Sequence, residues 1–243
     1  MLCVVWLYYS GFDPCSIGST GCSIAYGLTQ SGGKVGTLFV IVVTSAFQVA
    51  AFSSMKEKAM GFMRSFLVLS MLLAVLASFN EFVVKPALRV ARPSHAFILR
   101  QSHADVTLDS VYSLAEVKRK DLFRRLLATD TAEFRKIDPR VLDHWVDEAG
   151  YSFPSGHTFN AFLIGPLLAF SLISSRSRAI RFVCFLPLLW ALSVGVSRVS
   201  LGAHSALDVS VGAGMGLFLS HLLLFFPSTR RLLIPVATID NRR

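Results

Sequence analysis

Residues 153–174 read FPSGHTFNAFLIGPLLAFSLIS, a short polar turn that runs directly into an apolar stretch. The apolar part, Thr158 to Ser174, holds no charged residue and approaches the roughly 20 residues that a helix needs to cross the hydrocarbon core of a membrane. Within lipid the backbone polar groups must be paired inside their own segment, as an α-helix allows. The stretch therefore predicts a transmembrane helix that begins with polar, potentially reactive side chains.

Four more apolar stretches predict an all-α, polytopic bundle of transmembrane helices. They are Val35 to Phe52, Gly61 to Val84, Ile180 to Val196 and Ala206 to Phe226. The chain of 243 residues is 53% hydrophobic and only 16% charged, whereas about a quarter of the residues in a soluble domain are charged. A soluble globular domain is therefore excluded.

The N-terminal residues allow three interpretations: a shortened first span, a re-entrant or interfacial segment, or a chain start that has lost residues. Met1 to Tyr9 is too short to cross a membrane, and Asp13-Pro14 interrupts it. A first span extended through Leu28 would bring the number of spans to six. The four cysteines have no metal-binding spacing, but Cys15 and Cys22 share a polar segment and could pair in an oxidising compartment.

The formal charge of +9 is concentrated in three short segments beside predicted spans. Lys56 to Arg64, Arg176 to Arg181 and the tail from Arg230 together hold ten Lys and Arg. Basic loops of this kind remain in the cytoplasm, so the distribution indicates membrane orientation and gives no support for nucleic-acid binding. The long segment from Lys85 to Phe153 then lies on the opposite side of the membrane.

Within this long segment, residues 94–153 predict a small helical cap inserted into a single membrane domain. Val111 to Leu127 has polar and apolar residues at helical spacing, and Asp138-Pro139 is typical of a helix start. Trp145 is expected at the membrane interface, where tryptophan is enriched.

Three polar clusters interrupt the apolar pattern, and the predicted topology brings all three to the face that carries the cap. They contain Lys85 and Arg92; Ser155, Gly156 and His157; and Arg198, His204 and Asp208. Lysine and arginine suit the binding of phosphate oxygens, since arginine can bind two at once. A helix that begins at Ser-Gly offers a hydroxyl and backbone N–H groups to the same anion, and no glycine side chain blocks its approach.

The remaining residues of the clusters suit covalent phosphoryl transfer. His204 and Asp208 are four residues apart and would share one face of a helix, so Asp208 could accept the Nδ1 proton and leave Nε2 free for attack on phosphorus. His157 would protonate the leaving lipid oxygen and then activate water. This mechanism requires no metal and no cofactor.

Taken singly, such residues are more often structural, and we assign structural roles to His95, His103, His144, Arg89 and Arg100. A lone Lys or Arg at the end of a span usually anchors it at the interface. The joint occurrence of cations, histidines, an aspartate and a glycine-bearing helix start on one face favours a functional site. Ionisable groups at membrane depth are costly and commonly functional.

The three patterns Lys85-x6-Arg92-Pro93, Pro154-Ser155-Gly156-His157 and Ser197-Arg198-x5-His204-x3-Asp208 resemble the signature motifs of the type 2 phosphatidic acid phosphatase superfamily. The similarity runs from about Val84 to Val209 and does not include the first 30 residues. The resemblance implies six spans in a bacterial cytoplasmic membrane and an active site that faces the periplasm. It further implies His204 as nucleophile, Asp208 as its orienting residue and His157 as acid and base.

The substrates implied by this resemblance are membrane lipids with phosphate or diphosphate head groups, namely phosphatidylglycerophosphate, undecaprenyl diphosphate and phosphatidate. A lipid phosphotransferase or a lipid A phosphatase would use the same site. A transporter or lipid-binding protein with a disused site is a further alternative, although no catalytic residue is missing. The spans exclude a soluble haloperoxidase of the wider superfamily. The physiological lipid and the oligomeric state are left open.

Overall fold

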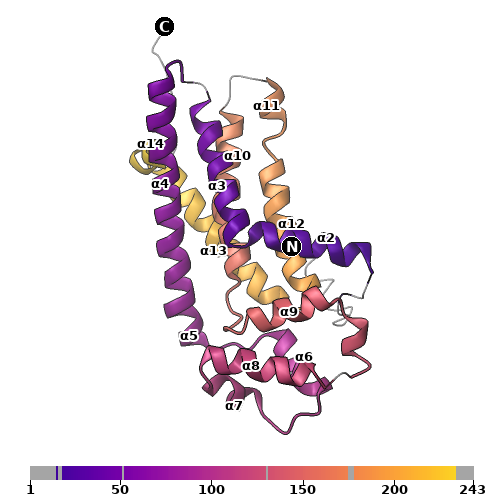
Figure 1. The fold of residues 1–243 in the computed structure, drawn as a ribbon. Helices are drawn as coiled ribbons and strands as arrows, with labels where there is room; N and C mark the ends of the chain where they lie inside the picture. Colours follow the sequence, from indigo (N-terminus) through magenta and orange to yellow (C-terminus); the bar gives the residue numbers. More distant parts are fainter. Residues whose placement is uncertain (1–14, 16–17, 51, 130, 175–177, 234–243) are drawn as a thin grey trace.

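The structure is a computed structural model that describes residues 15, 18–50, 52–129, 131–174 and 178–233. Among these residues all regular structure is helical, as the apolar pattern predicts (Figure 1). One group of helices stands roughly upright as a bundle, and the other lies across one end of it as a cap.

Within the part of the chain that the structure describes, four helical segments are long and apolar enough to cross a membrane: Met55–Leu88, Gly156–Ile173, Ile180–Ser200 and Ala206–Phe225. A fifth span is formed if two helices bent by 64° at Gly33 are taken as one broken span. Residues 1–14, which belong to the predicted sixth span, lie outside the described residues. The chain is a multi-pass membrane protein.

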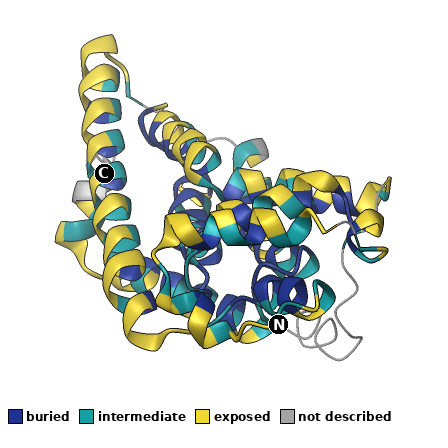
Figure 2. Cartoon of the chain, turned by 60° about the horizontal axis from the view of Figure 1, so that its bottom comes forward, coloured by how far each residue is buried: buried dark blue, intermediate teal, exposed yellow. Residues whose placement is uncertain are grey.

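In chain order the bundle elements are α2 (Thr20–Gly32), α3 (Lys34–Val49), α4 (Met55–Phe79), a π-helical turn η1 (Asn80–Val84), α5 (Lys85–Leu88), α10 (Gly156–Ile173), α11 (Arg178–Phe182), α12 (Leu186–Ser200), α13 (Ala206–Phe225) and α14 (Pro227–Leu233). The start of α4 and helix α11, both in basic segments, lie at the end away from the cap (Figure 1). Most of the outward face of α4 is exposed and apolar (Figure 2), including Met63, Leu67 and Met71. This surface suits contact with lipid.

Two glycines bring α13 against the backbone of α10. A Cβ atom at Gly212 would lie 2.6 Å from the carbonyl oxygen of Ser155, and one at Gly216 would lie 2.6 Å from that of Phe159. Small residues four apart allow membrane helices to approach this closely. The start of α10 is thereby fixed against the start of α13, so that two of the predicted clusters become neighbours.

The cap consists of α6 (Pro93–Gln101), α7 (Leu108–Ser113), α8 (Glu116–Leu127), a 3₁₀ turn η2 (Phe134–Lys136) and α9 (Pro139–Asp147). The expected helix start at Asp138-Pro139 is confirmed, since the Asp138 carboxylate accepts a hydrogen bond of 3.0 Å from the amide of Arg140. The periodic stretch 111–127 is not one helix, because Leu114 and Ala115 have extended backbones that separate α7 from α8.

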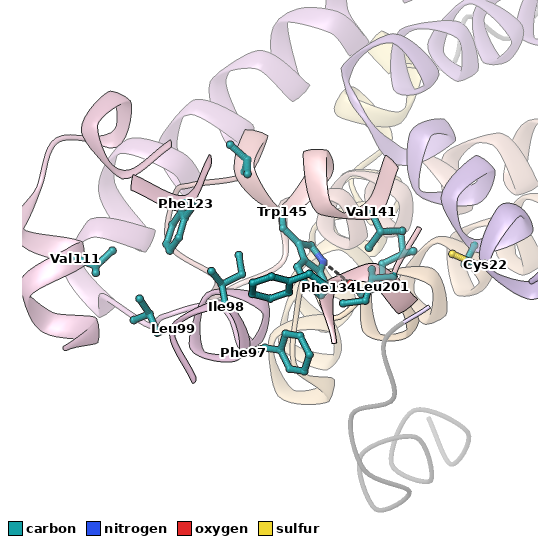
Figure 3. Packing of buried hydrophobic residues seen from close by; sticks show 13 residues of the cluster. Cys22, Phe97, Ile98, Leu99, Val111, Phe123, Phe134, Val141, Trp145 and Leu201 are labelled. Carbon is teal, nitrogen blue, oxygen red and sulfur yellow. Dashed lines mark hydrogen bonds between the residues drawn. The ribbon is translucent and has the colours of Figure 1, made fainter. Parts of the chain in front are cut away.

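The expectation that Trp145 lies at the membrane interface is wrong. Only 1% of Trp145 is exposed, and its Nε1 donates a hydrogen bond of 2.6 Å to the carbonyl oxygen of Leu201 (Figure 3). It packs in a core that joins the cap helices to Cys22 of α2 and to Leu201 after α12. The indole therefore finds both its apolar surroundings and its hydrogen-bond partner inside the protein. Cys15 and Cys22 are not joined by a disulfide.

Candidate active site

Short connections between the cap and the bundle position the predicted residues. Arg92 caps the start of α6, His157 lies in the first turn of α10, and Arg198 lies in the last turn of α12. His204 occupies the turn before α13, and Asp208 lies in the first turn of that helix. These five residues come together where the cap meets the bundle.

His204 and Asp208 are close, but for a different reason than one shared helical face. His204 precedes α13, and Ser205 caps the helix by accepting a hydrogen bond from the Asp208 amide at 3.1 Å while the Asp208 carboxylate accepts one from the Ser205 amide at 2.8 Å. This reciprocal capping box folds the carboxylate back toward the turn that carries His204.

Ser152 bridges His204 and Asp208. His204 Nδ1 lies 3.6 Å from Asp208 Oδ2, beyond hydrogen-bonding distance. The Ser152 hydroxyl lies between them, 3.2 Å from His204 Nδ1, and donates to Asp208 Oδ2. The expected direct pair is therefore a three-membered chain of buried groups, His204, Ser152 and Asp208.

Arg92 faces the other side of the His204 ring. Its Nη1 lies 3.0 Å from His204 Nε2, and it also contacts the Glu148 carboxylate at 2.7 Å and the Ala203 carbonyl oxygen at 3.0 Å. A guanidinium only donates, so Nε2 is the acceptor and the ring proton resides on Nδ1. Since Nη1 has two hydrogens for three acceptors, an arriving phosphate oxygen can replace one of them.

Burial, followed by the positive charge of Arg92, holds the pKa of His204 well below its usual range. The imidazole is therefore neutral at pH 7, and the lone pair of Nε2 is available to attack an electrophile.

Glu148 joins the two predicted arginines. Its Oε2 accepts hydrogen bonds from Arg92 Nη1 and from Arg198 Nη2. Burial raises the pKa of this carboxyl, but the surrounding cationic groups, led by Arg198 and Arg92, outweigh burial and hold the pKa well below its ordinary value. Glu148 is thus a carboxylate placed where two guanidiniums converge.

Arg198 is completely buried and surrounded by polar groups. Besides Glu148, its Nη1 donates to Thr29 Oγ1 at 2.9 Å and to His144 Nε2 at 2.8 Å. Its Nε has no hydrogen-bond partner among the described residues. A buried donor without a partner is costly, and a phosphate oxygen would satisfy it.

His157 is nearest the other oxygen of the Glu148 carboxylate, Oε1, whereas the arginines contact Oε2. Its Nδ1 is 3.7 Å from Glu148 Oε1, and about a quarter of the side chain is exposed. Ser155 caps α10, with its Oγ 3.0 Å from Thr158 Oγ1. The first amides of a helix, here those of Gly156 and His157, have no partner within the helix and can bind an anion.

Lys85 is buried like the arginines, but its hydrogen bond goes elsewhere. Its Nζ donates to Glu81 Oε2 at 2.6 Å within the same helical segment. A Cβ atom at Gly150 would come within 3.2 Å of Glu81 Oε1, which places the Lys85–Glu81 pair beside the segment that carries Glu148.

A second layer supports Arg92. The Arg92 amide donates a hydrogen bond of 3.0 Å to the Tyr112 hydroxyl. That hydroxyl lies 2.6 Å from His95 Nδ1. On the other side of its ring, His95 Nε2 lies 3.2 Å from the Trp145 carbonyl oxygen. The carbonyl must accept, so His95 donates from Nε2 and accepts at Nδ1. His95 therefore has the structural role expected for it.

Sequence reasoning missed Ser152, Glu148, His144 and Thr29. His144 received a structural interpretation, yet it accepts a hydrogen bond from Arg198. Glu148 and Ser152 precede His157 in a polar segment without an apolar run, which is the one signal that could have drawn attention to them.

Known proteins are similar to this chain over the region that contains the candidate site. The chain matches the PAP2 superfamily over residues 65–232. It is 32% identical to phosphatidylglycerophosphatase B of Escherichia coli over 128 residues, which are 53% of this chain and 47% of the relative. It is 25% identical to the Haemophilus influenzae protein of the same name over 205 residues, 83% of this chain and 80% of the relative.

A plant protein, the probable lipid phosphate phosphatase 4 of Arabidopsis thaliana, is 33% identical over 135 residues, 50% of this chain and 44% of that protein. This chain thus spans about half the length of several curated relatives that it matches. The matched superfamily region contains all three predicted clusters and all the contacts of Arg92 and His204 described above. The chain belongs to the PAP2 superfamily.

Proposed function

We propose that this protein is an integral membrane phosphatase that removes phosphate from a lipid through a phospho-histidine at His204. The observation that carries the proposal is the position of the His204 ring. Its unprotonated Nε2 accepts a hydrogen bond of 3.0 Å from Arg92 Nη1, which an arriving phosphate would displace, and its Nδ1 is connected through Ser152 to Asp208. A neutral nucleophile thus points toward cations that bind phosphate.

In the first step the lone pair of Nε2 forms a bond to phosphorus, and the bond between phosphorus and the lipid oxygen breaks. His157 donates a proton to the departing oxygen, so that a lipid alcohol or phosphate leaves. The Nδ1 proton of His204 stays in place, and the positive charge on the phosphorylated ring is stabilised by Ser152 and Asp208. Arg92 and Arg198 stabilise the charge that develops on the phosphoryl oxygens.

In the second step water attacks phosphorus while His157 accepts its proton. The N–P bond breaks, its electron pair returns to Nε2, and inorganic phosphate is released. This scheme uses only side chains of the protein and no metal ion. We expect activity to survive a chelator.

The proposed substrates are phosphatidylglycerophosphate and undecaprenyl diphosphate, with phosphatidate-type lipids also accepted. The names of the bacterial relatives support the first of these. The position of the basic segments away from the cap supports a site that faces the periplasmic side of a bacterial cytoplasmic membrane.

The test is phosphate release by the purified protein in detergent, from each of these lipids, with EDTA present. His204→Ala should lose activity by about 10³-fold or more, since it lacks the nucleophile. His221→Ala is the matched control, because His221 is an exposed histidine near the end of α13 whose hydrogen bond, among the described residues, stays within its own helix. Normal turnover in His204→Ala would overturn the mechanism.

A labelled donor separates hydrolysis from transfer. Recovery of the label as inorganic phosphate supports a phosphatase, and recovery in a second lipid identifies a phosphotransferase. Trapping of an acid-labile, alkali-stable phosphoprotein in the wild type and its absence in His204→Ala would support the covalent intermediate.

A further inference from the structure

Helix α2 lies outside the part of the chain that matches the PAP2 superfamily, yet it forms one wall of the candidate site. The superfamily match begins at residue 65, and α2 ends at Gly32. In Figure 1 α2 lies across the bundle near α12 and α9. Its buried residues, Cys22, Ala25, Thr29 and Gly32, follow helical spacing, so one face of α2 is directed into the protein.

Three contacts along α2 reach residues of the site. The Tyr26 ring meets the His144 ring edge-on at 6.1 Å, and His144 in turn accepts a hydrogen bond from Arg198. The buried Thr29 hydroxyl accepts a hydrogen bond of 2.9 Å directly from Arg198 Nη1. At the end of the helix, a Cβ atom at Gly33 would lie 3.5 Å from His157 Nε2.

The bend between α2 and α3 depends on small residues. A Cβ atom at Gly32 would lie 2.5 Å from Val194 of α12, so any side chain there would push α2 away from the bundle. Trp190, one turn earlier on α12, contacts the same bend by donating a hydrogen bond of 2.9 Å to Ser31 Oγ. The bend thus brings its backbone against α12 and beside the His157 ring.

We propose that α2 completes the active site, with Thr29 as the positioning residue for Arg198 and Gly33 as the residue that keeps space beside His157. The Thr29 hydroxyl accepts a hydrogen bond from Arg198 Nη1 and so holds the guanidinium in place. Arg198 Nε has no partner among the described residues and can donate to a phosphate oxygen. Gly33 leaves the Nε2 edge of His157 uncovered, so that a proton can enter or leave the ring. This inference rests on the proposed phosphatase function.

Substitutions at the two positions should change different kinetic quantities, phosphate affinity at Thr29 and kcat at Gly33. Thr29→Val keeps the shape of the side chain but removes the acceptor, so phosphate binding should weaken by about tenfold while kcat changes little. Thr29→Ser should recover most of this affinity. Gly33→Ala places a methyl group 3.5 Å from His157 Nε2 and 3.2 Å from the carbonyl oxygen of Gln30, which must shift slightly. The methyl group covers Nε2, so kcat should fall while phosphate affinity is retained.

The experiment measures kcat, KM and the inhibition constant for orthovanadate in the wild type and in each variant. Orthovanadate binding is measured in addition by the thermal shift it produces, which requires no turnover. Gly27→Ala is the control on the same helix, because a Cβ atom there meets nothing within 4 Å. The inference is overturned if Thr29→Val and Gly33→Ala behave like Gly27→Ala, or if they lower only the folded fraction.

These outcomes are distinct from failure of the proposed function. If the wild type released no phosphate from any lipid, the function would be wrong, while the vanadate shift would still report whether Thr29 supports the anion site. If the wild type is active and His204→Ala is inactive, but both α2 variants are normal, only the role of α2 is wrong.

Discussion

Ser152 contributes one hydroxyl to the site, and that hydroxyl connects His204, the proposed nucleophile, to the Asp208 carboxylate. Because His204 Nδ1 and Asp208 Oδ2 are 3.6 Å apart, the hydrogen bonds that connect them run through Ser152. Ser152→Ala should therefore reduce kcat by about 10- to 100-fold, because a ring that is misplaced by about 1 Å loses this much rate. KM should change little, since Arg92 and Arg198 remain.

Steady-state kinetics on the purified variants checks this prediction. Ser193→Ala serves as the control, because in the described part of the chain the Ser193 hydroxyl bonds only to the carbonyl oxygen of Leu189 in its own helix. An unchanged kcat in Ser152→Ala would mean that Asp208 acts without the serine.

His95 makes stability depend on pH. Burial, followed by the charge of Arg92, lowers the pKa of His95 to about 3, whereas an unfolded histidine has a pKa of about 6.5. Below about pH 6.5 the unfolded chain binds a proton that the folded chain does not, so stability falls as the pH drops from about 6.5 toward about 3. The loss is about 1.4 kcal/mol per pH unit for one such group.

We expect the wild-type Tm to fall between pH 7 and pH 5 and the fall to be shallower in His95→Gln. His144, whose pKa is lowered to about 4 mainly by burial, contributes to the slope that remains. Thermal unfolding in detergent at several pH values provides the measurement, with the exposed His103→Gln as control. A full wild-type slope in His95→Gln would assign the pH dependence to other groups.

At the scale of elements, the contact between α10 and α13 determines the distance between Ser155 and Asp208. The Ser155 amide donates to the Asp208 carbonyl oxygen at 3.1 Å, next to the point where a Cβ atom at Gly212 would collide with backbone. Gly212→Ala should separate the two helix starts, lower stability by about 1–3 kcal/mol and abolish most activity.

Gly214 provides the matched comparison on the same helix. A Cβ atom at Gly214 meets nothing within 4 Å, so Gly214→Ala should retain activity and gain up to about 1 kcal/mol of helix propensity. Thermal unfolding and phosphate release on both variants test the pair. Equal behaviour of the two alanines would show that the close approach is dispensable.

The elements also show what could be predicted from sequence. Long apolar runs predict helices such as α10 and α13 because the lipid environment leaves few alternatives for the backbone. The convergence of Arg92, His157 and His204 followed from topology. Other contacts depend on how segments pack: Glu148 meets Arg92 and Arg198 across 56 and 50 residues of chain, which no spacing rule connects.

Some local conformations could not be predicted from the sequence either. The spacing of His204 and Asp208 suggested one helical face, whereas a capping turn brings them close and leaves room for Ser152. The bend after Gly32 could not be predicted because it depends on the contact with Val194 of another helix. Trp145 was placed at the interface by its residue type, but the cap supplies the core in which it is buried.

At the scale of the whole molecule, the prediction concerns orientation in the membrane. Val117 on α8 and Met55 at the start of α4 are 71% and 78% exposed at opposite ends of the protein. In a variant that lacks the native cysteines, Val117→Cys should react with a membrane-impermeant maleimide in intact cells. Met55→Cys should react only after permeabilisation, because basic segments remain inside. The reverse labelling pattern would place the site in the cytoplasm.

The carboxylate shared by Arg92 and Arg198 also bears on which lipids the proposed phosphatase would accept. Most phospholipids of a bilayer are phosphodiesters with one negative charge on phosphorus, while a phosphate monoester has up to two. A phosphodiester that displaced Glu148 from the guanidiniums would replace one negative charge by another, so the electrostatic energy of the site would improve little. A monoester would bring a surplus charge, so in the proposed phosphatase we expect Glu148 to favour phosphate monoesters over the more abundant phosphodiesters.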